Sequence, residues 1–214
     1  MKSKDKICWL MTITTPFLSI ACSAGEIPAT TIAEGIDGYQ LMRDGKPYFI
    51  KGAGLTDHLD AFIEAGGNSI RTWGSEQSLE WLPRLDGTDV TMAAGIWIEH
   101  ERHGFDYDDE EAVASQLERH KADIEKIRHN PHILLWGIGN EVWIGAENPK
   151  VWDFIEKIAA HLKEVDPSRP TMTVLPYGSP EEVRYIKERC PSIDILGLNA
   201  YAGLDTVIPK IQEF

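Results

Sequence analysis

The chain has 214 residues, of which 43% are hydrophobic and 26% charged, an ordinary composition for one globular domain with a substantial core. Acidic residues outnumber basic ones by 34 to 21, and the formal net charge is −13. Nucleic-acid binding needs a basic footprint, so this balance argues against a nucleic-acid partner. Of the 3 cysteines, Cys8 and Cys22 lie in the first 22 residues and leave Cys190 alone, which excludes a disulfide framework and a cysteine metal cluster.

Residues 1–22 have the layout of a secretory signal peptide. Lysines at alternate positions open the chain, residues 7–21 are mostly apolar, and small residues surround Cys22. The apolar stretch is too short and too rich in threonine for a membrane span. We therefore expect an exported protein. The segment ending at Cys22 also resembles a lipoprotein cleavage site, although its Leu18 stands one place early, so a periplasmic, an extracellular and a membrane-attached outer-membrane lipoprotein all stay open.

Residues 23–36 have the composition of a linker, and we expect the folded domain to span residues 37–214. The domain begins with two β-prone segments, 39–42 and 47–51, which flank Asp44-Gly45. Asp-Gly is a preferred pair for a tight turn between antiparallel strands. This pattern predicts a β-hairpin at the start of the domain.

Short apolar segments then alternate with amphipathic ones. The alternation predicts a parallel sheet covered by helices, because a parallel strand is buried on both faces. We count about six βα units, the last helix beginning near Thr206. The expected strands are residues 68–73, 90–98, 133–138, 170–174 and 195–198, and the expected helices are residues 57–65, 76–84, 110–129, 150–165 and 180–189.

Two architectures would accommodate these units. An open doubly wound sheet requires a glycine-rich phosphate turn, and residues 51–55 (KGAGL) offer only a weak G-x-G. A (β/α)8 TIM barrel requires eight units and about 250 residues. We therefore expect an incomplete barrel and a chain that is a fragment of a longer protein, because unpaired strand edges would be a solubility liability.

The most informative segment for chemistry is WGIGNE, residues 136–141. Reactive groups of a barrel lie where its strands end, and here a buried apolar strand delivers Asn140 and Glu141 at its carboxyl end. Such a carboxyl among tryptophans suits a general acid. An Asn-Glu pair that only caps a helix is the alternative. The strand before it favours the catalytic interpretation.

The string WGIGNE after NPHILL resembles the acid/base motif of clan A glycoside hydrolases, closest to the barrel of glycoside hydrolase family 2, with family 5 also similar. The resemblance covers about residues 38–205 and implies that Glu141 is the acid/base carboxyl. It also implies that Asn140 binds the sugar 2-hydroxyl, that Arg71 braces the nucleophile, and that Tyr201, in the segment with Asn199, donates a hydrogen bond to the nucleophile. The nucleophilic glutamate is expected beyond residue 214. Family 2 enzymes carry β-sandwich domains before the barrel, whereas only a linker is expected there in this sequence.

The end of the third strand is dense in polar groups. His100 and the neighbouring Glu99 could bind sugar hydroxyls or form an ordinary polar loop, and a metal site built on His100 and His103 ranks behind both. Trp73, Trp97 and Trp143 are candidate platforms for a sugar face, and core packing is at least as strong an expectation for each of them. Core packing is the strongest expectation for Trp136 and Trp152. We expect no metal and no cofactor.

The sequence thus predicts a retaining glycoside hydrolase that acts on β-linked glycosides or glycans. Its expected partner is an oligosaccharide or polysaccharide. A transglycosylase is a close alternative, because the same covalent intermediate can pass to a sugar hydroxyl. A non-catalytic glycan-binding barrel lipoprotein is the alternative from another class, and a metal-dependent barrel hydrolase is a third.

Overall fold

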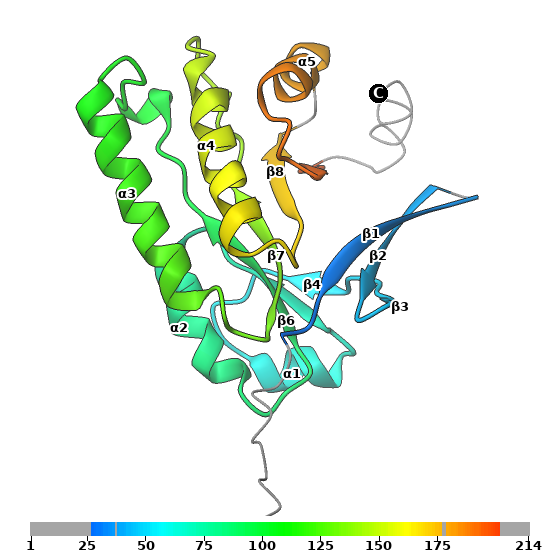
Figure 1. The fold of residues 1–214 in the computed structure, drawn as a ribbon. Helices are drawn as coiled ribbons and strands as arrows, with labels where there is room; N and C mark the ends of the chain where they lie inside the picture. Colours follow the sequence, from blue (N-terminus) through cyan, green and yellow to red (C-terminus); the bar gives the residue numbers. More distant parts are fainter. Residues whose placement is uncertain (1–26, 37, 177–178, 202–214) are drawn as a thin grey trace, which may run out of the picture.

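The computed structural model describes residues 27–36, 38–176 and 179–201, and its centre is a curved parallel sheet (Figure 1). Six strands follow one another across this sheet in chain order. Each pairs in parallel with the next, so all carboxyl ends lie along one edge. The strands are β4 (Gly52–Ala53), β5 (Ser69–Arg71), β6 (Thr91–Ile96), β7 (Ile133–Ile138), β8 (Thr171–Leu175) and β9 (Ile195–Leu198).

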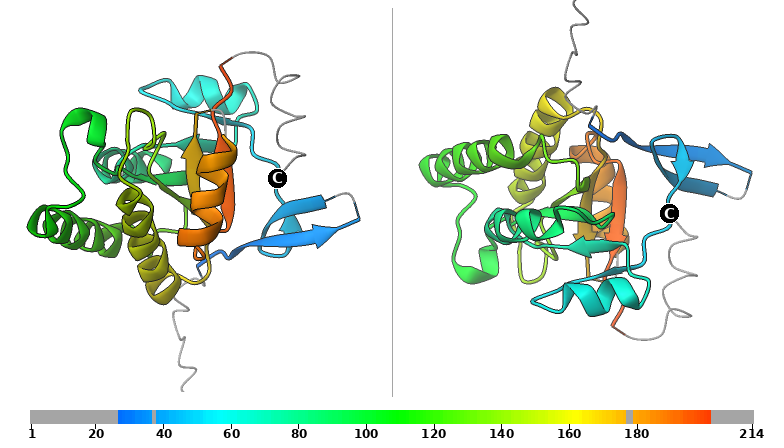
Figure 2. Two further views of the ribbon diagram at one scale, coloured as in Figure 1. Left: turned by 90° about the horizontal axis from the view of Figure 1, so that it is seen from above. Right: turned by 90° about the horizontal axis from the view of Figure 1, so that it is seen from below.

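A helix follows each of the first five strands, which confirms the βα alternation. The helices are α1 (Leu59–Glu64), α2 (Ser75–Leu85), α3 (Glu110–Ile127), α4 (Lys150–Val165) and α5 (Pro180–Arg189), with a short 3-10 helix, η1 (Glu101–His103), after β6. Helices α2, α3 and α4 lie side by side along the sheet, and α5 lies beside α4 (Figure 2). This is the arrangement of an incomplete TIM barrel. None of the helices among the described residues is long and apolar enough to cross a membrane.

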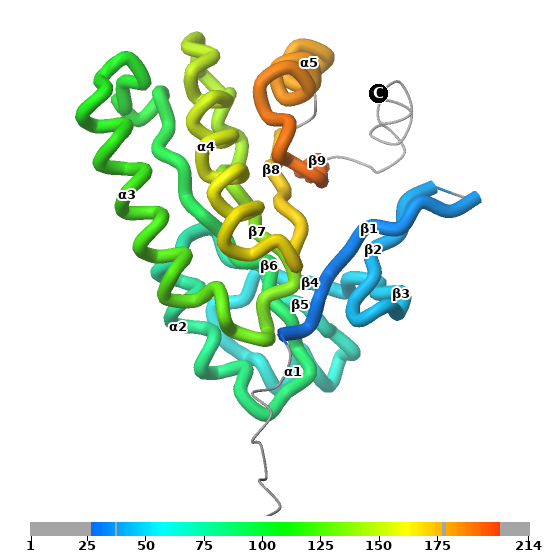
Figure 3. The backbone as a smooth tube through the Cα atoms, in the orientation of Figure 1, coloured from blue at the N-terminus to red at the C-terminus, as the bar shows by residue number. Residues whose placement is uncertain are grey.

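The chain enters the sheet through a small antiparallel sheet that projects away from the helices (Figure 3). Strands β2 (Gly38–Arg43) and β3 (Lys46–Pro47) form the predicted hairpin, but β3 ends at Pro47 and does not extend over the expected residues 47–51. Asp44 and Gly45 have φ angles of 49° and 72°, the left-handed conformation that a tight hairpin turn requires.

One expectation for this region is wrong. Residues 30–35, expected to lie in the linker, form strand β1 (Thr30–Gly35), which pairs residue by residue with β2. The sequence of this segment, TTIAEG, has no apolar alternation that would identify it as a strand, and only its first residue is buried. Its conformation comes from its hydrogen bonds with β2.

The core lies between the sheet and the helices. Every residue of β6 and β7 is buried, which explains why both strands have apolar residues on both faces. Helix α4 buries the apolar stripe predicted from its sequence, including Ile155 and Ile158. The predicted bounds of β7, β9, α4 and α5 agree with the structure. The expected signal peptide, Cys22 and the helix near Thr206 lie outside the described residues.

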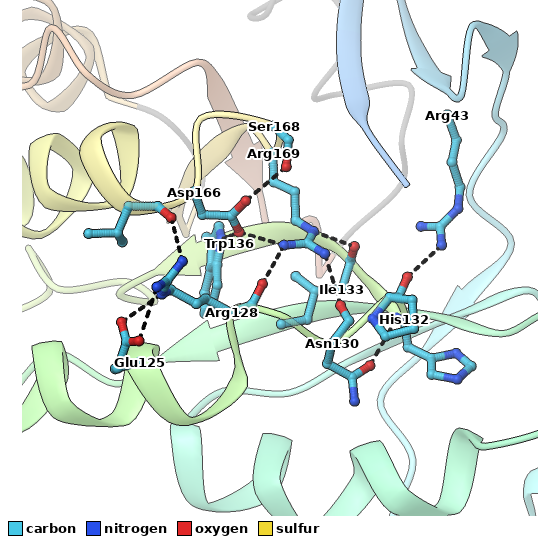
Figure 4. A network of polar contacts seen from close by, with 12 residues as sticks. Arg43, Glu125, Arg128, Asn130, His132, Ile133, Trp136, Asp166, Ser168 and Arg169 are labelled. Carbon is cyan, nitrogen blue, oxygen red and sulfur yellow. Dashed lines mark hydrogen bonds and ion pairs between the residues drawn. The ribbon is translucent and has the colours of Figure 1, made fainter. Parts of the chain in front are cut away.

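A buried polar network holds the loops at the amino ends of β7 and β8 (Figure 4). Arg169 is 1% exposed and donates to the backbone oxygens of Arg128, Asn130 and Ile133 over 2.7–2.9 Å. Its Nη1 also lies 2.6 Å from Oδ2 of Asp166. The same carboxylate oxygen accepts the indole N–H of Trp136 at 2.8 Å. The network therefore ties two loops to the fourth strand of the sheet.

Candidate active site

Polar side chains from three strands meet at the carboxyl edge of the sheet. Arg71 is the last residue of β5, Asn140 and Glu141 follow β7, and Asn199 and Tyr201 follow β9. These are the second, fourth and sixth strands of the sheet. Because alternate strands of a barrel direct side chains into the same interior layer, residues 58 or more positions apart come together here.

Glu141 is the centre of this cluster and is 9% exposed. Its Oε1 accepts hydrogen bonds from the side-chain amide of Asn199 and from the hydroxyl of Tyr201, both at 2.7 Å. Hydrogen bonds to a carboxylate are stronger than those between neutral groups, so these two donors hold the carboxyl in a defined orientation.

The neighbouring amide of Asn140 is held from two sides. Its Oδ1 accepts from Nη2 of Arg71 at 2.8 Å and from Nδ2 of Asn199 at 3.1 Å. Two donors on Oδ1 identify the oxygen end of this amide. Asn199 therefore connects Asn140 to Glu141, and all three side chains have a fixed arrangement.

The backbone at Glu141 is strained. Glu141 has a φ of 55°, in the left-handed region that residues other than glycine rarely adopt, and Gly139 just before it has a φ of 71°. A Cβ at Gly139 would also lie 2.9 Å from Cγ1 of Val142, so a glycine is required there. The backbone N–H of Glu141 donates to the oxygen of Val174 at 2.8 Å, which anchors the turn to β8. Strain of this kind is concentrated at functional sites.

Arg71 is partly buried beside this carboxyl. Burial lowers the pKa of its guanidinium, while Tyr201 and Glu141 act in the opposite direction. Its Cζ lies 5.2 Å from the ring centroid of Trp73, a cation–π contact. The resemblance assigned Arg71 and Tyr201 to contacts with the expected nucleophile. Among the described residues they contact Asn140 and Glu141 instead, and their roles stay predictions.

His100 is buried in a stack of rings beside this site. Its ring lies between those of Trp97, 4.9 Å away, and His103, 5.1 Å away, with interplanar angles of 9° and 13°. Burial lowers the pKa of His100 to about 4, with Arg102 and His103 acting in the same direction. Neither ring nitrogen has a hydrogen-bond partner among the described residues. A neutral imidazole offers one donor and one acceptor, but this ring is 0% exposed, so its role in sugar binding stays a prediction.

The tryptophans divide into two groups. Trp73 is 38% exposed, and both Trp73 and Trp97 line an open pocket, as a binding platform must. Trp143 packs against Trp152 at 5.9 Å and against Tyr185 at 5.2 Å between ring centroids, which indicates a packing role. Trp136 and Trp152 are fully buried, as predicted.

Three polar residues of α3 that lie beside the site, Arg119, His120 and Asp123, gave no signal in the sequence. Glu99 forms an ion pair of 3.2 Å with Arg119 of α3, and His120 and Asp123 of the same helix line the pocket beside Trp97. Only their position on a helix next to the strand ends reveals them. Within the part of the chain that the structure describes, no group of three or more metal-ligating side chains comes together.

The buried histidines predict a pH-dependent stability. His120 is 4% exposed, and burial lowers its pKa to about 4, as for His100. The unfolded chain, with a histidine pKa of about 6.5, binds more protons between these values. The contribution of these neutral histidines to the free energy of unfolding should therefore be complete above about pH 6.5 and be lost as the pH decreases to 4.

Urea denaturation at pH 7 and pH 4 of the wild type and of His120→Gln measures this effect. The substitution should remove roughly 3 kcal/mol of the loss on acidification, because each pKa unit corresponds to about 1.4 kcal/mol. His129→Gln, on the exposed side after α3, is the matched control and should keep the wild-type pH dependence. An unchanged pH dependence in His120→Gln would show that this histidine is not the cause.

The fold and the position of the polar cluster define an α/β barrel protein with a site at the carboxyl ends of its strands. The family model for "Glycosyl hydrolases family 2, TIM barrel domain" matches residues 85–214. The chain therefore belongs to glycoside hydrolase family 2, and the matched part is its TIM-barrel domain. A search of curated proteins finds no match.

Solved structures with the same fold include a candidate β-galactosidase from Bacteroides fragilis, at 20% identity and a TM-score of 0.64. The match covers 87% of this chain and 29% of that protein. A β-glucuronidase from Parabacteroides merdae is 18% identical over 87% of this chain and 25% of its own, with a TM-score of 0.62. A β-glucuronidase from Bacteroides uniformis is 19% identical over 81% and 24%, with a TM-score of 0.61. The chain spans less than a third of the length of these proteins.

Proposed function

We propose that this protein is a retaining glycoside hydrolase of β-linked glycosides and that Glu141 is its general acid/base. The observation that carries the proposal is the environment of Glu141. Its carboxyl lies at the carboxyl edge of the sheet, 9% exposed, with two hydrogen bonds that orient Oε1. Membership of glycoside hydrolase family 2 supports the reaction class.

In the first step, Glu141 donates its proton to the glycosidic oxygen while a second carboxylate attacks the anomeric carbon. The bond between the anomeric carbon and that oxygen breaks, and a covalent glycosyl–enzyme intermediate forms. In the second step, the Glu141 carboxylate accepts a proton from water, which displaces the enzyme carboxylate. Both hydrogen bonds reach Oε1, so we place the transferable proton on Oε2.

The attacking carboxylate is proposed to be a glutamate that follows β9 in the chain. A retaining mechanism requires the two carboxyl groups to lie about 5–5.5 Å apart, which leaves no room for a water between them. A glutamate at the end of a further strand beside β9 would share the carboxyl edge of the sheet with Glu141. The proposed mechanism therefore requires both the described strands and the further strand that carries the nucleophile.

Asn140 is proposed to bind a hydroxyl of the sugar that is cleaved. Its Oδ1 already accepts from Arg71 and Asn199, so its Nδ2 is the end that would donate to the substrate. Hydrogen bonds to the sugar that strengthen in the transition state contribute several kcal/mol to glycoside hydrolysis. Arg71 acts here as a positioning residue, because it acts on substrate through Asn140.

The stereochemistry of the first product tests the mechanism. We would incubate the active enzyme, meaning the protein that includes the strand with the proposed nucleophile, with aryl β-glycosides of common sugars. The anomeric proton signals would be followed by NMR. A retaining enzyme releases the β-anomer first, and the α-anomer appears only later by mutarotation. Early release of the α-anomer would show an inverting reaction, which requires a wider separation of the two carboxyl groups.

A further inference from the structure

A second concave site lies beside the active site, between the strand ends and helices α2 and α3. It is a pocket of about 590 Å³. The side chains that matter for its chemistry are Trp73, Trp97, Glu99, Arg119, His120 and Asp123. We propose that this pocket binds a neutral sugar unit of the substrate, distinct from the sugar that is cleaved at Glu141. The proposal deepens the function proposed above and rests on it.

Two tryptophans give the pocket its aromatic surface. Trp73 follows β5 and is 38% exposed, and Trp97 follows β6 and is half-buried. A sugar ring has an apolar face of C–H groups and a rim of hydroxyls. The C–H face packs well on a flat indole ring, whose large apolar area contributes most of the contact energy.

Polar groups surround this aromatic surface, as the hydroxyl rim of a sugar requires. Arg119 and Glu99 form an ion pair of 3.2 Å in the pocket wall, and each is partly exposed. His120 is 4% exposed, and its Nδ1 has no hydrogen-bond partner among the described residues. A buried polar atom without a partner is costly. A pocket with an aromatic surface and a few polar groups is typical of small-molecule sites.

The charge of the pocket favours a neutral sugar over a uronic acid. Three carboxylates line it among the described residues, those of Glu76, Glu99 and Asp123. Arg119 pairs with Glu99 and Lys126 pairs with Asp123, so the pocket has an excess of one negative charge. This excess of negative charge would repel a second carboxylate brought in by the ligand. Hydroxyl groups, in contrast, can donate hydrogen bonds to all three carboxylates.

The pocket is connected to the active site through its two tryptophans. Trp73 contacts Arg71, which donates to Asn140, and Trp97 stacks on His100. Each tryptophan therefore belongs to the wall of the pocket and also contacts a residue next to the Glu141 cluster. The proposal requires that a β-linked oligosaccharide reaches both places at once. The pocket would make the enzyme favour oligosaccharides over glycosides of a single sugar.

Binding measurements on the Glu141→Gln protein test this proposal without turnover. Calorimetry would use four neutral β-linked tetrasaccharides: cellotetraose, β-1,4-galactotetraose, β-1,4-mannotetraose and β-1,4-xylotetraose. We expect at least one to bind, with Kd about tenfold weaker in Trp97→Ala and about threefold weaker in Arg119→Ala. Arg119 is a surface residue, so its variant keeps the test valid if Trp97→Ala does not fold. Lys121→Ala, an ion-paired lysine of the same helix outside the pocket, is the matched control and should bind like the parent.

The outcomes separate this proposal from the proposed function. No binding of any tetrasaccharide, or equal binding by Arg119→Ala and Lys121→Ala, overturns the pocket. If the wild type still hydrolyses an aryl β-glycoside in that case, the proposed function survives. Tetrasaccharide binding that weakens in Arg119→Ala, without hydrolysis of any substrate by the wild type, supports the pocket and rejects the proposed function.

Discussion

Glu141→Gln should lower kcat/KM of the active enzyme about 10³-fold for β-glycosides with a poor leaving group. The amide keeps the shape of the carboxyl and can still accept from Asn199 and Tyr201, which now donate to Oε1 of Glu141. It cannot donate a proton to the glycosidic oxygen. General acid/base groups contribute about 10²–10⁴-fold to a rate, and the effect is largest when the leaving group needs a proton.

Two comparisons make this measurement specific. A dinitrophenyl glycoside, which leaves without protonation, should lose much less in the first step. Glu147→Gln is the matched control, because Glu147 lies in the loop after Glu141 with an exposed side chain. It should keep activity within about twofold. Full activity of Glu141→Gln on poor leaving groups would rule out this residue as the acid. Sugar binding by a wild type that hydrolyses nothing would favour a glycan-binding barrel.

Arg169→Met should lower the free energy of unfolding by about 3–5 kcal/mol. Methionine approximates the length of the side chain but leaves Asp166 buried without its ion-pair partner, which now lies 2.6 Å away. Three backbone oxygens in the loops at the amino ends of β7 and β8 lose their donors as well. A buried charge without a partner is among the largest single causes of destabilisation.

Urea denaturation at pH 7 measures the loss, and two further variants identify its cause. Arg84→Met, which removes an exposed arginine paired at 3.7 Å with Glu80 and lying 4.5 Å from the ring centroid of Trp81, should change stability by less than about 1 kcal/mol. The double substitution Asp166→Asn with Arg169→Met should be more stable than Arg169→Met alone, because no unpaired charge remains. Equal stability of the single and double variants would mean that the lost backbone contacts, and not the charge, dominate.

The βα alternation and the position of Glu141 could be predicted because both depend on local patterns. Strand β7 is apolar on both faces, and α4 has one apolar stripe, so their bounds follow from periodicity alone. The carboxyl ends of parallel strands share one edge, so a residue that follows a strand has a known place in the fold. The resemblance to clan A glycoside hydrolases placed Arg71, Asn140 and Asn199 in the same site as Glu141, and the hydrogen bonds among them agree.

Other features depend on contacts between distant segments. Strand β1 has no apolar pattern and exists because β2 provides hydrogen bonds to it. The second pocket combines residues of β-strand ends with Arg119 and His120 of α3, and helical periodicity does not say which neighbour a polar face will meet.

The sequence by itself determined the order of the helices and of strands β5 to β9 and the strand end that carries Glu141, because hydrophobic periodicity acts over a few residues. Only the tertiary structure decided which side chains touch. It placed Tyr201 on Glu141, stacked Trp97 on His100, and paired Arg169 with Asp166 in the core. The physical reason is that each of these contacts depends on distance and angle after the sheet has curved, and neither quantity is encoded in the spacing of residues along the chain.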